Sequence, residues 1–356
     1  MDRRTLLLGI AGWPALGRAR AQPALRFPAD FGAHPETRTE WWYVTGTLRA
    51  GARLWGFQVT FFRSATGLEA SPTSRFDASQ LIFAHAALTD LEQRRLRHDQ
   101  RIARSGFGIA QARTGDTGIA LRDWRIDRVP LPSDSQRSRY TASIASDSAG
   151  FAFDLQFDAT QAVLLQGDGG VSKKGPGAAQ VSHYYSEPQL AVQGTLTLDG
   201  LRVGVQGRAW LDHEWSDSFI DPQAVGWDWI GMNLDDGGAL TAFRLRRADG
   251  TNLYAGGSSR RAGEPARIFG PDEVRFTPGR LWESAASRAR YPVQWRIDTP
   301  EGRFSVNALL DNQELDSRAS TSAIYWEGLS DLLDEAGVRV GRGYLEMTGY
   351  ATALRL

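Results

Sequence analysis

The residues best suited to chemistry gather between positions 211 and 234, in the segments Asp212-His213-Glu214-Trp215 and Trp227-Asp228-Trp229. Carboxylates beside indole rings are costly to bury without a partner or a purpose. Addition of water to an unactivated carbon–carbon double bond needs a proton donor, a surface that stabilises a carbocation, and a positioned water. These side-chain types can supply all three, so the stretch is a candidate site for acid catalysis.

The order of residues in the first segment predicts where each side chain points. Side chains alternate along a strand, so Asp212 and Glu214 share one face while His213 and Trp215 share the other. The apolar residues upstream have the parity of His213. We therefore expect His213 and Trp215 to face an apolar interior, and the two acids to face outward or toward a domain junction.

The residues predicted to carry this chemistry are His213 and Asp228. His213 can orient or deprotonate a water molecule. Asp228 is the predicted proton donor, on the basis of its residue type and its position between two tryptophans. The alternatives are a structural role, with His213 as a hydrogen-bonded core histidine, and ligand contact without chemistry.

Five further side chains are candidate ligand contacts, namely Trp42, Tyr43, His85, Trp227 and Trp229. For several of them, a structural role in the core is the alternative. His85 shares its parity with apolar neighbours, which is typical of a satisfied core histidine. Trp42 and Tyr43 suit the core and closure of a barrel.

Composition excludes several classes of function. The net charge is zero and no basic patch of the size needed for nucleic-acid binding is present. There are no cysteines, which excludes disulfides and thiolate metal sites. The motifs of P-loop proteins, α/β-hydrolases and His-Glu-x-x-His metalloproteases are absent. The sequence thus predicts neither a metal nor a cofactor.

The N-terminal segment 1–21 has the pattern of an export signal. Arg3 and Arg4 precede an apolar run, and Ala19-Arg20-Ala21 fits a cleavage site. The adjacent arginines resemble a twin-arginine signal, although an ordinary Sec signal is the alternative. The apolar run is too short to span a bilayer. We expect a periplasmic protein with no stable membrane span in its mature form.

Hydrophobic patterning predicts a protein built almost wholly of strands. Residues 54–62 alternate in strand fashion, and most later segments do likewise between frequent turns. Residues 328–336 are the best candidate for a short helix. The pattern of residues 41–59 returns at positions 227–245 without a gap, which predicts two tandem units, 22–218 and 219–356. Strand number and the lack of βαβ alternation favour sandwiches or up-and-down barrels.

Several motifs resemble a known family. These are Glu40-Trp-Trp-Tyr-Val-Thr-Gly, Phe83-Ala-His-Ala-Ala, Ala209-Trp-Leu-Asp-His-Glu-Trp, Gly226-Trp-Asp-Trp and Gly343-Tyr-Leu-Glu-Met-Thr-Gly-Tyr. In this order they resemble the AttH/CrtC-type two-domain lipocalin-like family, whose best-known enzyme branch is carotenoid 1,2-hydratase (hydroxyneurosporene synthase). The resemblance implies an all-β chain with two tandem lipocalin-like antiparallel β-barrel domains. It also implies that His213 and Trp215 belong to the hydratase site.

Two functions follow as expectations. The first is an exported protein that binds or carries an apolar lipid or isoprenoid in a barrel cavity. The second is a hydro-lyase of the carotenoid 1,2-hydratase type. The first predicts a dry cavity with few ionisable groups, whereas the second predicts His213 and an acid meeting at one apolar pocket. A purely structural module would instead have barrels filled by their own side chains.

Overall fold

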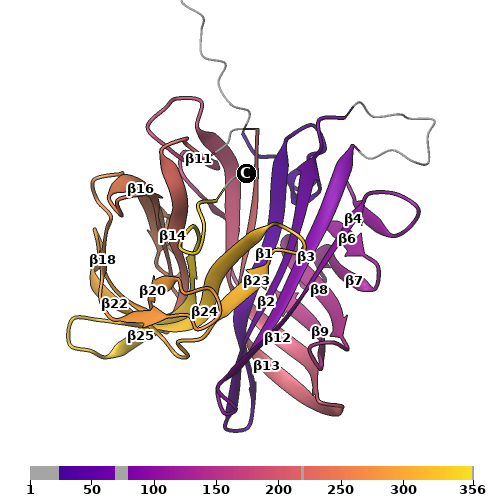
Figure 1. Cartoon of the computed structure of the whole chain (residues 1–356). Coiled ribbons are helices and arrows are strands. Elements are labelled where there is room, and N and C mark those ends of the chain that lie inside the picture. Colours follow the sequence, from indigo (N-terminus) through magenta and orange to yellow (C-terminus); the bar gives the residue numbers. More distant parts are fainter. Residues whose placement is uncertain (1–23, 69–78, 218–219, 355–356) are drawn as a thin grey trace, which may run out of the picture.

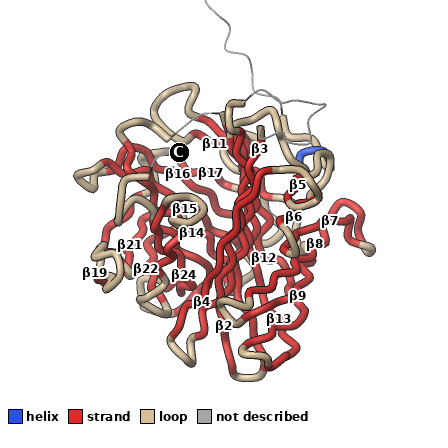
Figure 2. Tube along the Cα trace, turned by 45° about the vertical axis from the view of Figure 1, so that its right-hand side comes forward, coloured by secondary structure: helices blue, strands red, loops and turns tan. Residues whose placement is uncertain are grey.

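The chain folds into two antiparallel β-barrels of the lipocalin-like type that lie side by side (Figure 1). The computed structural model describes residues 24–68, 79–217 and 220–354. Strands account for most of this length, and the 3-10 turn η1 (Ala29–Phe31) is a single short helical segment among the described residues (Figure 2). None of the helical structure described could cross a membrane. The predicted export signal lies outside the described residues.

The first barrel is one sheet of 13 strands in which neighbours along the chain mostly pair. Its strands are β1 (Thr39–Ala50), β2 (Arg53–Ala65), β3 (Gln80–Asp90), β4 (Arg95–Arg104), β5 (Ala110–Ala112), β6 (Gly118–Leu121), β7 (Trp124–Leu131), β8 (Asp134–Ser146), β9 (Phe151–Asp158), β10 (Leu164–Leu165), β11 (Val171–Lys173), β12 (Val181–Leu198) and β13 (Leu201–Ser216). The order β4-β3-β2-β1-β13-β12-β9-β8-β7-β6-β5 places the first strand beside the last.

Side chains rather than backbone hydrogen bonds bring the two ends of this sheet together. Arg101 of β4 forms an ion pair with Asp123, and its guanidinium lies 4.2 Å from the ring centroid of Trp124 on β7. Arg101 also donates to the carbonyl oxygen of Ala145 at 2.9 Å. The barrel is therefore nearly closed, which protects the edge strands β4 and β5 from pairing with other chains.

The second barrel is a sheet of ten strands. They are β14 (Ala224–Leu234), β15 (Ala239–Arg247), β16 (Asn252–Arg260), β17 (Arg267–Phe269), β18 (Arg275–Pro278), β21 (Gln294–Thr299), β22 (Gly302–Ala308), β23 (Glu314–Ser317), β24 (Ala323–Leu333) and β25 (Arg339–Met347), while β19 (Leu281–Glu283) and β20 (Arg290–Pro292) form a separate pair. The helix predicted over 328–336 is wrong, because residues 328–333 continue β24 and pair with β25.

The first strands of the two barrels, β1 and β14, align without a gap. The strands that follow them, β2 and β15, align only when a gap is placed in the turn of the hairpin. In the first barrel Val44 pairs with Val59. The ungapped match equates Val44 with Ile230 and Val59 with Leu245, yet Ile230 pairs with Ala242. Ile230 therefore pairs with a residue three positions before the one that the ungapped match predicts. The second hairpin is shorter by these residues, and the ungapped match is wrong after the turn.

Large aromatic side chains occupy the interior of the first barrel. The fully buried residues include Trp42, Trp55, Phe57, Phe61 and Trp124. They lie on the inward faces of strands whose opposite faces carry polar residues or pack against the second barrel. Most of this interior is thus a packed core, as small barrels commonly have.

The outer faces of β1, β2 and β13 pack against the outer faces of β14, β24 and β25 to form the junction between the barrels. Gly56 on β2 permits the close approach, because a Cβ atom there would lie 2.6 Å from the hydroxyl of Tyr344 and 3.0 Å from Cβ of Leu329. A side chain at position 56 would thus crowd the junction.

We expect Gly56→Ala to lower the free energy of unfolding by about 1–3 kcal/mol, because the added methyl group overpacks the junction. Denaturant unfolding measures this change. Gly204→Ala is the matched control, since its Cβ would have nothing within 4 Å. Equal stability of the two variants would contradict the close packing at Gly56.

Candidate functional site

His213 lies inside the first barrel, as the alternation along β13 predicts. Its side chain is completely buried. The pairing of β1 with β13 places Trp42 directly opposite, and the two rings stack with centroids 4.5 Å apart. The ring of Trp215 lies 4.8 Å from that of His213 on the same inner face. Three of the predicted site residues, Trp42, His213 and Trp215, are therefore neighbours.

A carboxylate that the sequence analysis did not select lies at the centre of this group. Oε1 of Glu40 is 2.9 Å from Nε2 of His213 and 2.8 Å from Nδ1 of His34. Nε of Arg63 donates to the other oxygen at 2.7 Å. Tyr185 Oη lies 3.0 Å from Nδ1 of His213. Glu40 shares the parity of Trp42, but only the strand register shows that it faces His213.

The network keeps Glu40 ionised although it is buried. Burial would raise the pKa of this carboxyl group, but hydrogen bonds from His213 and His34 lower it to about 2. Burial lowers the pKa of His213 below its ordinary value despite the neighbouring Glu40. Burial opposes protonation of His34 as well, yet its bonds to Glu40 and Asp30 prevail and raise its pKa. The cluster thus holds one fixed anion among hydrogen-bond donors.

Asp228, the predicted proton donor, lies in the interior of the second barrel and does not meet His213. Strand alternation explains this, because Trp227 and Trp229 point to the opposite face of β14. Nε of Arg244 donates to Asp228 at 2.7 Å, and the hydroxyl of Tyr350 donates at 2.9 Å. Asp228 is thus a buried, paired carboxylate.

His85 lies at the junction, on the outer face of β3. Its Nδ1 is 2.8 Å from the hydroxyl of Tyr325 and its Nε2 is 2.8 Å from the hydroxyl of Ser320. Burial lowers the pKa of His85 to about 3, so its ring is neutral at physiological pH. Both ring nitrogens bond to the second barrel, and His85 therefore contributes to its docking.

The outer face of β13 brings a second set of acids to the junction. Asp212 and Glu214 project there, and Glu327 and Glu346 from the second barrel lie directly opposite each other in the β24–β25 register. Nζ of Lys174 lies 2.9 Å from Glu214. Within the described residues, no basic side chain forms an ion pair with Asp212, Glu327 or Glu346. These three carboxyls are the unusual feature of the junction.

Aromatic rings surround these acids. Trp229 lies between Tyr43 and Trp210, with ring centroids 5.4 and 6.3 Å away. Trp227 is half-buried at the edge of the same cluster. Three of the predicted ligand contacts, Tyr43, Trp227 and Trp229, thus share this apolar surface. The hydroxyl of Tyr43 faces Glu327 and offsets part of the effect of burial on the pKa of that carboxyl group.

Burial raises the pKa of three of the junction carboxyls. Burial raises the pKa of Asp212 to about 7, although Ser186 and Trp210 donate hydrogen bonds to it. Burial, with the negative charges of Asp212 and Glu214, raises the pKa of Glu346 to about 7. Burial and Glu346 raise the pKa of Glu327 well above its ordinary value. Carboxyls poised in this way can act as acid and base.

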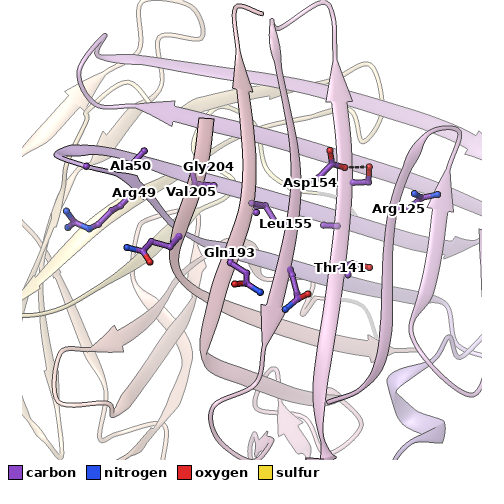
Figure 3. A pocket seen from close by; sticks show the side chains of 15 residues that line it. Arg49, Ala50, Arg125, Thr141, Asp154, Leu155, Gln193, Gly204 and Val205 are labelled. Atoms are coloured by element: carbon purple, nitrogen blue, oxygen red, sulfur yellow. Dashed lines mark hydrogen bonds between the residues drawn. The ribbon is translucent and has the colours of Figure 1, made fainter. Parts of the chain in front are cut away.

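A groove of about 820 Å³ lies elsewhere, over the outer surface of the first barrel (Figure 3). Arg49, Arg125, Asp154, Gln193 and Gln206 contribute its polar lining. Arg49 is nine positions from Glu40 along β1, which is about 30 Å at the rise of a strand. This groove is therefore separate from the His213 cluster and has a poor chemical match to an apolar ligand.

The comparisons with known proteins cover nearly the whole chain. The model of the AttH-like family matches residues 18–350. The chain belongs to the AttH-like family. A solved structure of an AttH from Nitrosomonas europaea is 45% identical, with a TM-score of 0.83, over 93% of this chain and 98% of that one.

Two comparisons involve kievitone hydratase. The enzyme of Fusarium solani subsp. phaseoli is 23% identical over 249 residues, which cover 68% of this chain and 67% of that protein. The crystal structure of kievitone hydratase from Nectria haematococca has a TM-score of 0.69 at 18% identity, covering 93% and 94% of the two chains. At this identity the structural likeness shows a shared fold.

We expect Glu40→Gln to destabilise the protein by about 3–5 kcal/mol, because Arg63 then lacks its buried counter-ion. The folded pKa of Glu40 is about 2, against an ordinary value of 4.5. Its ionisation therefore contributes on the order of 3 kcal/mol above pH 4.5, and this is lost as pH falls through the folded pKa. Urea unfolding at pH 7 and pH 3 measures both effects. Wild type and variant losing equal stability between these pH values would contradict the assignment.

Proposed function

We propose that the protein binds an apolar small molecule at the junction and adds water to one of its carbon–carbon double bonds by acid catalysis. The observation that carries this proposal is the pair Asp212 and Glu346. Both have a pKa of about 7 and both lie among aromatic rings. Two titratable groups poised near neutrality can exchange the protons that hydration requires.

The hydrogen bonds of the two carboxyls suggest different roles. Asp212 accepts bonds from Ser186 at 2.5 Å and from the indole of Trp210 at 2.7 Å, and such donors favour the ionised form. Burial and the negative charges of Asp212 and Glu214 oppose ionisation of Glu346. We assign protonated Glu346 as the acid and ionised Asp212 as the base.

In the proposed reaction Glu346 transfers its proton to one alkene carbon, which leaves a carbocation at the other. A water molecule bonds to that carbon through its oxygen and gives one proton to Asp212. Return of this proton to Glu346 completes the cycle, so the net change is addition of one water. The reverse sequence is dehydration.

The aromatic rings of the junction suit the intermediate. The faces of Trp, Tyr and Phe attract positive charge. One cation already uses them, since Nζ of Lys174 lies 4.5 Å from the ring centroid of Tyr184 and 4.7 Å from that of Phe243. Trp210 and Trp229 are the rings assigned to the carbocation. His213, Trp215 and Trp42 lie on the other side of the β1–β13 sheet and have no place in this reaction.

The comparisons support this choice of chemistry. One relative carries the name kievitone hydratase. Carotenoid 1,2-hydratase, which the sequence motifs resemble, would perform the same addition on an isoprenoid. Binding or carriage of a lipid or isoprenoid without chemistry is the second candidate. It is favoured by the burial of Glu327, which raises the pKa of that carboxyl group and so opposes a negative charge at the junction.

We also propose that this activity is periplasmic, on the basis of the predicted export signal in residues 1–21. The proposed units are 22–218 and 219–356, and each would contribute one side of the junction. Neither Asp212 nor Glu346 forms the site alone.

Incubation with kievitone and with acyclic carotenoids in 18O-labelled water tests the reaction. We expect a labelled alcohol from at least one substrate. Asp212→Asn and Glu346→Gln should lower kcat by about 10²–10⁴-fold, the usual contribution of a positioned acid or base. Asp331→Asn is the matched control, because Asp331 lies on β24 but pairs with Arg342. Binding without labelled product would favour the carrier.

The proposed roles also fix the pH dependence. Activity requires protonated Glu346 and ionised Asp212, so we expect kcat to be greatest near pH 7. It should fall at lower pH as Asp212 is protonated and at higher pH as Glu346 ionises. The rate is measured from pH 5 to pH 9, which extends about two pH units below and above the two pKa values. This range covers the fall in rate at low pH and the fall at high pH. A rate that stays constant over this range would contradict the assignment.

A further inference from the structure

A second cluster of ligand-type side chains lies inside the first barrel, and the proposed hydration uses none of it. One ligand atom from each of His34, Glu40 and His213 lies within 4.8 Å of the others. The three come from the segment before β1, from β1 and from β13. Two imidazoles and one carboxylate form the protein ligand set of some zinc sites. We propose that this cluster binds a divalent transition-metal ion of the zinc class.

Two of the three distances within the cluster are shorter than those of a metal centre. Nδ1 of His34 and Nε2 of His213 lie 2.8 and 2.9 Å from the same oxygen of Glu40. In a tetrahedral zinc site with bonds of about 2.0–2.1 Å, the ligand atoms lie about 3.4 Å apart. An ion therefore requires Glu40 to withdraw by roughly half an ångström, and it replaces the protons that now bridge the three groups.

Each histidine has a partner on the nitrogen that faces away from the centre. Tyr185 Oη lies 3.0 Å from Nδ1 of His213, and Oδ1 of Asp30 lies 3.3 Å from Nε2 of His34. Metal-binding histidines usually have such a partner, which orients the ring. The remaining nitrogens are the ones that face Glu40.

Ring stacking fixes both imidazoles. The ring of His34 lies 3.8 Å from that of Trp215, nearly parallel, and the ring of His213 stacks on Trp42. The side chain of His34 is 12% exposed, whereas that of His213 is 0% exposed. An ion can therefore approach from the side of His34.

The second barrel provides an internal comparison. In the first barrel Trp42 pairs with Phe61 on β2 and with His213 on β13. At the equivalent place in the second barrel, Asp228 pairs with Arg244 on β15 and with Met347 on β25. Two barrels of one architecture thus differ at this level. Because the second barrel is filled by other residue types at this level, packing alone does not explain the two histidines and the glutamate of the first barrel.

Metal binding to the full mature chain tests the proposal. Protein treated with a chelator is loaded with Zn²⁺ or Co²⁺ and passed through gel filtration, and bound metal is measured by mass spectrometry. We expect one ion per chain, a visible Co²⁺ absorption spectrum, and a rise in Tm on addition of Zn²⁺. His34→Asn and His213→Asn should lose all three responses. His98→Asn, which removes a histidine on β4, should retain them.

His213 is fully buried and its replacement risks misfolding, so His34→Asn is the deciding variant. Circular dichroism establishes that it is folded. Stoichiometric binding by folded His34→Asn, or no binding by wild type, would overturn the proposal.

Discussion

The alternation of side chains along β13 sends neighbouring reactive residues to two different clusters. Successive residues of a strand point to opposite faces. His213 and Trp215 therefore enter the first barrel, whereas Asp212 and Glu214 enter the junction, although the four are adjacent in sequence. A shift of one residue in the pairing with β1 would exchange the two sets and expose the aromatic core. The register is thus the constraint on which both clusters depend.

The two clusters handle the cost of burying carboxyl groups in different ways. Glu40 keeps its charge, because His213, His34 and Arg63 surround it with donors. Glu327 and Glu346 form no ion pair with a basic side chain among the described residues, and burial raises the pKa of both carboxyl groups. A carboxylate that is stabilised by donors and a cation does not exchange its proton at physiological pH, whereas a carboxyl group that burial keeps protonated can donate its proton. This difference favours the junction over the barrel interior as the place of acid catalysis.

Much of the fold could be predicted from the sequence. The strand patterns, the duplication and the family motifs indicated two antiparallel barrels, and strand parity correctly placed His213 and Trp215 inside. Parity applied to Trp227-Asp228-Trp229 would also have separated Asp228 from the indoles. Sequence adjacency suggested a shared environment that strand geometry forbids.

The contents of each cluster could not be predicted, because they depend on pairing between distant strands. Glu40 reaches His213 only through the pairing of β1 with β13, the first and last long strands of the barrel. Glu327 and Glu346 meet only in the register of β24 and β25.

Infrared spectroscopy of the carboxyl groups at neutral pH tests the central claim most directly. A protonated carboxyl has a carbonyl-stretching band distinct from those of carboxylates, and the band shifts in D₂O. The account predicts such a band in the wild type near pH 7, reduced in Glu327→Gln and in Glu346→Gln, with no change in Asp331→Asn. A wild-type spectrum with only ionised carboxylates would contradict it.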